Sequence, residues 1–183
     1  MKLLFLPYLL LLLPGCLDRE YPIEFFKEEV RMEITSSTVM VNGHYFFRNR
    51  TLEKKLVKLY YPFPVDEYHL YPDSVDVKGM NFKRVGDGLV FLLEMGPRES
   101  TDVKVAYRQA LLTNHARYIL TSAREWGEPI AAALFIVTAP RGYELTLSYR
   151  PDSVAEVEEK TICYFVRNDL FPEKELDVWW EKP

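Results

Sequence analysis

Residues 39–47 read VMVNGHYFF, in which every second residue, counted from Val39, is an apolar or aromatic residue or a glycine. Val39, Val41, Gly43, Tyr45 and Phe47 would all lie on one side of an extended chain, because successive side chains of a strand point to opposite faces. Valine, tyrosine and phenylalanine are also residues that strands favour. This stretch therefore predicts a β-strand with one buried face.

The same period of two recurs along the chain on both sides of this stretch. We expect about ten strands: 30–34, 39–47, 56–61, 89–95, 103–107, 118–120, 130–138, 145–149, 162–166 and 175–180. Many short strands with turn residues between them are typical of an all-β sandwich or barrel rather than of alternating βαβ units. We predict a single immunoglobulin-like or related β-sandwich with at most one short helix.

The sequence does not decide between helix and strand for two segments. Residues 107–116 could hold one helical turn around Arg108–Leu112, and short apolar runs do not settle this by periodicity. Ala131–Ala133 has good helix propensity, but Pro129 before it and Phe135–Thr138 after it favour a strand.

A Pro-Asp-Ser-Val sequence occurs twice, at 72–75 and 151–154. Proline sets φ for a turn, while Asp and Ser side chains hydrogen-bond to nearby backbone. Two similar turns that feed two similar strands explain the repeat. A duplicated pair of small β modules is the alternative.

The N-terminus has the features of a secretory signal. Lys2 is its one charge, an apolar run follows from Leu3 to Leu13, and a small residue, Gly15, precedes Cys16. About 11 apolar residues are too few for a membrane span, which needs roughly 20. An ordinary signal peptide with a nearby cysteine is the alternative to the interpretation that follows.

The sequence Leu12-Leu13-Pro14-Gly15-Cys16 resembles the lipobox of bacterial lipoproteins. The resemblance implies cleavage before Cys16 and acylation of its thiol, with palmitate for example, and of its new amino group. We therefore expect a removed signal peptide at 1–15, a lipidated cysteine with a short tether at 16–24, and a β-sandwich domain at 25–183. Extended, the tether reaches at most about 28 Å.

The residues after Cys16 indicate the membrane in which the protein is expected to be anchored. Asp18 does not follow Cys16 directly, since Leu17 intervenes. The resemblance to sorted lipoproteins then implies the outer membrane, facing the periplasm, if the organism has two membranes. Otherwise it implies the outer face of the cell membrane.

The net charge and the cysteines limit the kinds of partner that the protein is expected to bind. The net charge of −4 becomes −5 once Lys2 is removed with the signal. A mildly acidic domain does not suit nucleic acid, which calls for a basic face, so contact with the membrane would come through acyl chains on Cys16. Cys163, left alone by acylation of Cys16, sits in an apolar run and is expected to be buried.

Known catalytic and cofactor motifs are missing from the sequence. It holds no Gly-x-Ser-x-Gly, no His-Glu-x-x-His, no Cys-x-x-Cys and no Gly-rich phosphate loop. His44, His69 and His115 are dispersed, although they could meet in space as a zinc site. We predict no metal site, no cofactor and no enzymatic activity.

An aromatic segment is the candidate binding feature. Tyr61, Phe63, Tyr68 and Tyr71 are interleaved with prolines, which exclude a central strand and indicate a strand end and loop. Tyrosine-bearing loops on a rigid scaffold are common recognition surfaces. The alternative is that these rings pack over the end of the sandwich, and Phe63 is expected to do so.

Residues 43–49 followed by 61–64 also resemble the front half of extracytoplasmic β-sandwich modules, over roughly residues 39–79. That resemblance implies a fold and no activity.

Three functions remain open. The first is a non-enzymatic envelope lipoprotein that binds a protein, a glycan or another envelope component. The second is a carrier of lipid or another apolar ligand. A hydrolase with dispersed catalytic residues is a third.

Overall fold

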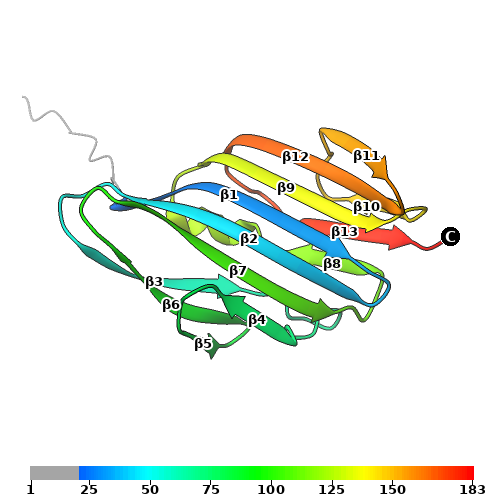
Figure 1. Cartoon of the computed structure of the whole chain (residues 1–183), viewed down its shortest axis with the longest axis horizontal. Coiled ribbons are helices and arrows are strands. Elements are labelled where there is room, and N and C mark those ends of the chain that lie inside the picture. Colours follow the sequence, from blue (N-terminus) through cyan, green and yellow to red (C-terminus); the bar gives the residue numbers. More distant parts are fainter. Residues whose placement is uncertain (1–20) are drawn as a thin grey trace, which may run out of the picture.

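The protein is described by a computed structural model over residues 21–183 (Figure 1). Cys16, the lipobox and most of the expected tether lie outside these residues. The described part contains thirteen strands and one 3₁₀ helix, which confirms the prediction of an all-β sandwich. Among residues 21–183, no helix has the length and apolar character needed to cross a membrane.

The elements follow one another in this order: β1 Ile23–Ile34, β2 Thr38–Asn49, β3 Lys55–Pro62, β4 Ser74–Val77, β5 Phe82–Val85, β6 Gly88–Met95, β7 Ser100–Ala110, β8 His115–Tyr118, η1 Thr121–Trp126, β9 Ile130–Pro140, β10 Glu144–Leu147, β11 Ser153–Val157, β12 Lys160–Leu170 and β13 Leu176–Glu181.

The strands form one large and two small sheets. The seven-stranded sheet has the order β11-β12-β9-β1-β2-β7-β4, and the three-stranded sheets have the orders β10-β13-β8 and β3-β6-β5 (Figure 1). Both small sheets contact the same face of the large one: Tyr61 of β3 packs on Tyr45 of β2, and Tyr118 of β8 packs on Phe135 of β9. The core lies between these two layers.

The alternation in β2 is confirmed. Val39, Val41, Tyr45 and Phe47 are buried in the core. Gly43 leaves space for the ring of Tyr45, because a Cβ atom at position 43 would overlap the Tyr45 hydroxyl group. The glycine is therefore required by a close approach within the sheet.

A bulge in β1 determines which of its side chains face the core. The register against β2 shifts between Phe25 and Lys27. Phe25 faces inward before the shift, and Glu28 and Val30 face inward after it. A bulge changes the phase of the alternation in this way, and it places the carboxyl group of Glu28 inside the sandwich.

The two Pro-Asp-Ser-Val sequences begin the two edge strands of the large sheet, β4 and β11. In each motif the aspartate pairs with an arginine of the neighbouring strand. Arg108 donates to Asp73 at 2.8 Å and 3.1 Å, and Arg167 donates to Asp152 at 2.6 Å. Similar turns therefore lead into similar edge strands at opposite sides of one sheet.

Neither of the two segments left open by the sequence is helical. β7 runs through Ala110, so residues 108–110 are extended, and Ala131–Ala133 belong to β9. The short helix lies at Thr121–Trp126 instead. Cys163 of β12 is buried, as expected, and no disulfide joins it to another residue among residues 21–183.

Candidate functional site

A recess lies where three segments distant in sequence meet. Its volume is about 460 Å³, and it is lined by Asp66, Tyr68, Thr113, Asn114, His115, Arg117 and Trp179. We call it the Trp179 recess. The β3–β4 loop supplies Asp66 and Tyr68, β8 and the turn before it supply the next four residues, and β13 supplies Trp179.

The β3–β4 loop is held in place by a side chain from the large sheet. Gln109 of β7 is fully buried, and its Nε2 donates to the carbonyl oxygens of Pro64, at 2.8 Å, and of Leu70. Within the loop, the Asp66 carboxylate accepts the backbone N–H groups of Tyr68 and His69 at 2.8 Å and 2.9 Å. Such an Asx-type turn fixes the local backbone, so Tyr68 is presented from a rigid support.

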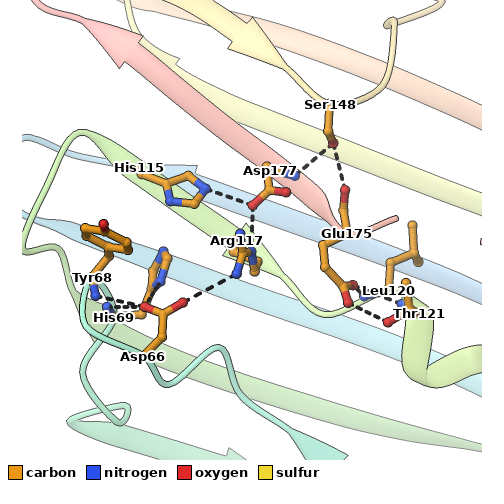
Figure 2. A network of polar contacts seen from close by, with 10 residues as sticks. All are labelled: Asp66, Tyr68, His69, His115, Arg117, Leu120, Thr121, Ser148, Glu175 and Asp177. Atoms are coloured by element: carbon orange, nitrogen blue, oxygen red, sulfur yellow. Dashed lines mark hydrogen bonds and ion pairs between the residues drawn. The ribbon is translucent and has the colours of Figure 1, made fainter. Parts of the chain in front are cut away.

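Two histidine–aspartate pairs meet beside the recess (Figure 2). His69 Nδ1 lies 2.7 Å from Asp66 Oδ1, and His115 Nε2 lies 2.8 Å from Asp177 Oδ1. The two imidazole rings are 4.8 Å apart in an edge-on arrangement. Arg117 joins the pairs, since its Nε donates to Asp177 at 2.7 Å and its Nη1 reaches Asp66 at 3.4 Å.

The charge states of these groups follow from their neighbours. Burial works against ionisation of Asp66, but hydrogen bonds from the Tyr68 backbone and from His69 outweigh it and lower the pKa. Burial likewise opposes ionisation of Asp177, and His115 and Arg117 outweigh it and lower its pKa. Burial lowers the pKa of His69 despite the adjacent Asp66. At pH 7 both aspartates are ionised and His69 is neutral.

The network continues away from the recess. The Ser148 hydroxyl donates to the Glu175 carbonyl at 2.8 Å and accepts from the Asp177 backbone at 2.9 Å. The Glu175 carboxylate accepts the backbone N–H groups of Leu120 and Thr121 (Figure 2). These contacts fix the start of η1 relative to β13 and therefore rigidify the region behind the recess.

Two exposed rings complete the recess. Trp179 is 40% exposed and stacks on His115 with the rings 4.8 Å apart and nearly parallel, at 4°. Tyr68 is 46% exposed. An aromatic surface beside a fixed cation and fixed anions can bind a partner that offers both apolar area and hydrogen-bonding groups.

The four aromatic residues of the predicted binding segment are not brought together at the surface. Tyr68 lines the Trp179 recess, whereas Phe63 is buried, as expected from its position between prolines. Tyr61 faces the interior, where its hydroxyl lies 2.8 Å from that of Tyr45. Tyr71 is half-buried against Phe63, with the Arg84 guanidinium 3.5 Å from its ring centroid.

Sequence reasoning missed His115, Arg117, Gln109 and Trp179 as contributors. One signal was available for Trp179. Within a predicted strand that ends in two tryptophans, Trp179 and Trp180 must face opposite sides, and only one of them can join the core. Trp180 is buried and Trp179 is exposed.

The three histidines do not converge. His69 and His115 are adjacent, but His44 lies on β2 and pairs with Asp102 at 2.7 Å. Within residues 21–183, no three side chains of His, Cys, Asp or Glu are arranged to hold a metal ion.

Comparison with known proteins identifies a shared fold and no family. No family model matches the chain, and no curated protein matches it. Among solved structures, it is similar to a candidate nutrient-binding protein from Legionella pneumophila at 11% identity and a TM-score of 0.64, over 86% of this chain and 66% of the other.

Two metallopeptidase structures are also similar. A point mutant of an M1 zinc metallopeptidase from Deinococcus radiodurans matches at 10% identity and a TM-score of 0.50, over 86% of this chain and 42% of the other. A two-domain M1 zinc metallopeptidase bound to L-arginine matches at 11% identity and a TM-score of 0.51, over 86% and 42%. The chain spans just under two thirds of the first structure and less than half of the others, and at these identities the likeness establishes the β-sandwich fold alone.

Proposed function

We propose that this protein is a non-enzymatic, lipid-anchored binding module of the bacterial cell envelope and that it holds its partner in the Trp179 recess. One observation carries the proposal. Trp179, Tyr68 and Arg117, which line this recess, are of the three residue types most enriched among interface residues that dominate binding energy. The partner is an envelope protein or glycan.

The anchor rests on the lipobox resemblance at Cys16. β1 begins at Ile23, so only residues 17–22 separate Cys16 from the folded sheet. A chain of this length reaches about 20 Å when extended. Two acyl chains would hold the protein firmly, whereas one would not, and the resemblance implies at least two.

The arrangement of the domain suits such an anchor. The chain enters at the start of β1, at the left of Figure 1, while the β7–β8 turn and the end of β13 lie at the right. β1 spans 12 residues, or about 40 Å. The Trp179 recess therefore lies at the end of the domain remote from the proposed attachment point, where a partner could reach it.

The interior supports a binding module over a lipid carrier. The cavity between the large sheet and β3 has a volume of about 80 Å³, whereas pockets for ligands of drug-like size measure about 300–1,000 Å³. An acyl chain would not fit into this space.

The anchor is tested by Cys16→Ser in the full-length chain. We expect a precursor of full length and no incorporation of labelled palmitate. Labelling of the variant at the wild-type level would show that Cys16 is not the acylated residue.

The recess is tested by recovery of a partner from solubilised envelope with the full-length protein. We expect Trp179→Ala and Tyr68→Ala each to reduce recovery by more than about tenfold, the loss typical of a dominant interface residue. Phe82→Ala is the matched control, because Phe82 is 39% exposed on β5, away from the recess. Recovery of the partner at the wild-type level with Trp179→Ala and Tyr68→Ala, as with Phe82→Ala, would refute the proposed site.

A further inference from the structure

A second cavity lies inside the sandwich, between the large sheet on one side and β3 and η1 on the other. Its volume is about 80 Å³. We call it the Glu28 chamber, after the carboxylate that lines it together with the rings of Phe25, Tyr45, Tyr61, Tyr118 and Trp126. It is separate from the Trp179 recess, with which it shares no lining residue.

Glu28 is an unusual occupant of such a position. The residue is 2% exposed, and its cross-strand neighbours in the large sheet are Tyr45 and Ala133. Its Oε2 accepts a long hydrogen bond from the Tyr118 hydroxyl at 3.3 Å, and its Oε1 has no hydrogen-bond partner among the described residues. A buried carboxyl oxygen without a partner is costly, so such groups in native proteins call for an explanation.

The walls around Glu28 are aromatic. Phe25 stacks on Phe47 at 5.2 Å between ring centroids, and Trp126 lies 5.2 Å from Phe47 and 6.0 Å from Phe25. Tyr45 and Tyr61 meet edge to face at 5.6 Å. Faces of aromatic rings attract cations, and a ring cluster of this kind is the usual site for an alkylated ammonium group.

Within residues 21–183, no positively charged side chain lies beside Glu28 in the chamber. The described residues that line the chamber include no lysine, arginine or histidine. Three tyrosines line the chamber from different elements, Tyr45 on β2, Tyr61 on β3 and Tyr118 on β8. Their hydroxyl groups are linked by contacts of 2.8 Å and 3.1 Å, and that of Tyr118 donates to the carboxyl group. The chamber thus offers a carboxyl group that can ionise, hydroxyl oxygens and ring faces, and none of its described lining residues is positively charged.

We propose that the Glu28 chamber is a binding site for a small alkylammonium ion. The ammonium group lies against the free Oε1 of Glu28, and its alkyl substituents contact the rings of Phe25, Tyr45 and Trp126. The small volume limits the ligand to a compact head such as methylammonium or trimethylammonium.

Binding at this site is linked to proton release. Burial raises the pKa of Glu28 to about 8, although the hydrogen bond from Tyr118 acts in the opposite direction. Burial also raises the pKa values of Tyr45, Tyr61 and Tyr118, so these hydroxyls stay neutral. A cation selects the ionised form of Glu28, so the affinity should rise about tenfold per pH unit up to about pH 8 and then level off.

The test is isothermal titration of the purified full-length protein with methylammonium or trimethylammonium chloride, with sodium chloride and tert-butanol as the inorganic and neutral controls. Titrations in two buffers of different ionisation enthalpy report the protons released. We expect an ammonium ion to bind with release of close to one proton at pH 6, and neither control to bind.

Glu28→Gln keeps the shape of the side chain and removes its charge. We expect it to weaken ammonium binding by at least about tenfold, the loss of a charged hydrogen bond, and to abolish the dependence on pH. Glu33→Gln, on the same strand but 40% exposed at its side chain, is the matched control and should bind as the wild type does.

Tyr118→Phe is a second variant that keeps the proposal testable if Glu28→Gln does not fold, because it retains both the Glu28 carboxylate and the aromatic ring at position 118. We expect this variant to bind the ammonium ion with the same tenfold gain per pH unit below pH 8 and to level off at a higher pH, because it lacks the hydrogen bond that lowers the pKa of Glu28. Absence of binding to the wild type, as for a chamber that holds only water, would overturn the proposal. Equal binding by Glu28→Gln would overturn it as well.

Discussion

Glu28→Gln should change how the stability of this protein depends on pH. The pKa of Glu28 is about 8 in the folded chain and 4.5 for an unperturbed glutamate. Below pH 4.5 both states are protonated, so the folded state carries no penalty. As pH rises toward 8, the unfolded chain loses this proton while the folded chain keeps it, and stability falls with pH.

The size of the effect follows from that difference in pKa. One pKa unit corresponds to about 1.4 kcal/mol, so the wild type should lose about 5 kcal/mol from this group between pH 4.5 and pH 8. Glutamine does not titrate, and Glu28→Gln should lack this component. The free energy of unfolding of a typical domain is about 5–15 kcal/mol, so the difference is a large part of the total.

This loss of stability is measured by urea denaturation of the full-length chain at intervals from pH 4 to pH 9. The buffer contains no amines. The informative quantity is the difference between variant and wild type, because other titrating groups cancel. We expect that difference to grow in favour of Glu28→Gln up to about pH 8 and then to stay constant. Glu33→Gln should show no such growth. Parallel curves for wild type and Glu28→Gln would show that Glu28 is not held protonated by burial.

Three further results are expected. Gln109→Met should cost about 2–4 kcal/mol, because it leaves the buried Pro64 carbonyl and the partly buried Leu70 carbonyl of the β3–β4 loop without their donor, and urea denaturation measures this cost; a cost below about 0.5 kcal/mol would mean that the loop does not depend on Gln109. Cys163 should react slowly with a thiol reagent in the native protein and quickly in denaturant, since burial shields the thiol and raises its pKa; prompt native labelling would contradict its burial. Gly43→Ala should destabilise the protein by about 1–3 kcal/mol, because the new methyl group displaces the Tyr45 ring; an unchanged melting temperature would show that the ring moves aside freely.

Most of the strands could be predicted from the sequence, because each of the longer ones buries one face and so alternates. The strands missed were β4, β5 and β11, which have four or five residues each. The strand expected at 118–120 was misplaced, because β8 covers His115–Tyr118 and ends where that expectation began. Segments this short carry too few residues for a period of two to stand out. β5 in addition has no buried side chain.

The buried glutamate could have been anticipated in part. Glu28 lies in phase with Val30, Met32 and Ile34, which were expected to share one side of a strand. Phe25 lies in the opposite phase, and only the bulge reconciles the two. A bulge depends on pairing with the neighbouring strand, which local sequence does not report.

Of the residues that line the Trp179 recess, only Tyr68 was predicted from the sequence as a binding residue. The exposure of Tyr68 and the burial of Phe63 follow from their local surroundings, and both are confirmed. The approach of β8 and β13 to the β3–β4 loop depends on tertiary packing of segments more than forty residues apart. No local pattern encodes that approach.

The position of β1 in the middle of the large sheet governs the order in which the chain can fold. β1 pairs with β2, which follows directly, but its other neighbour is β9, a parallel strand about a hundred residues further along. Contacts between such distant residues make folding slow. Until β9 arrives, the open side of β1 presents unpaired backbone groups, which invite pairing with other chains. A chain that ends before β9 would therefore be expected to aggregate, even though the β1–β2 hairpin and β7 are complete.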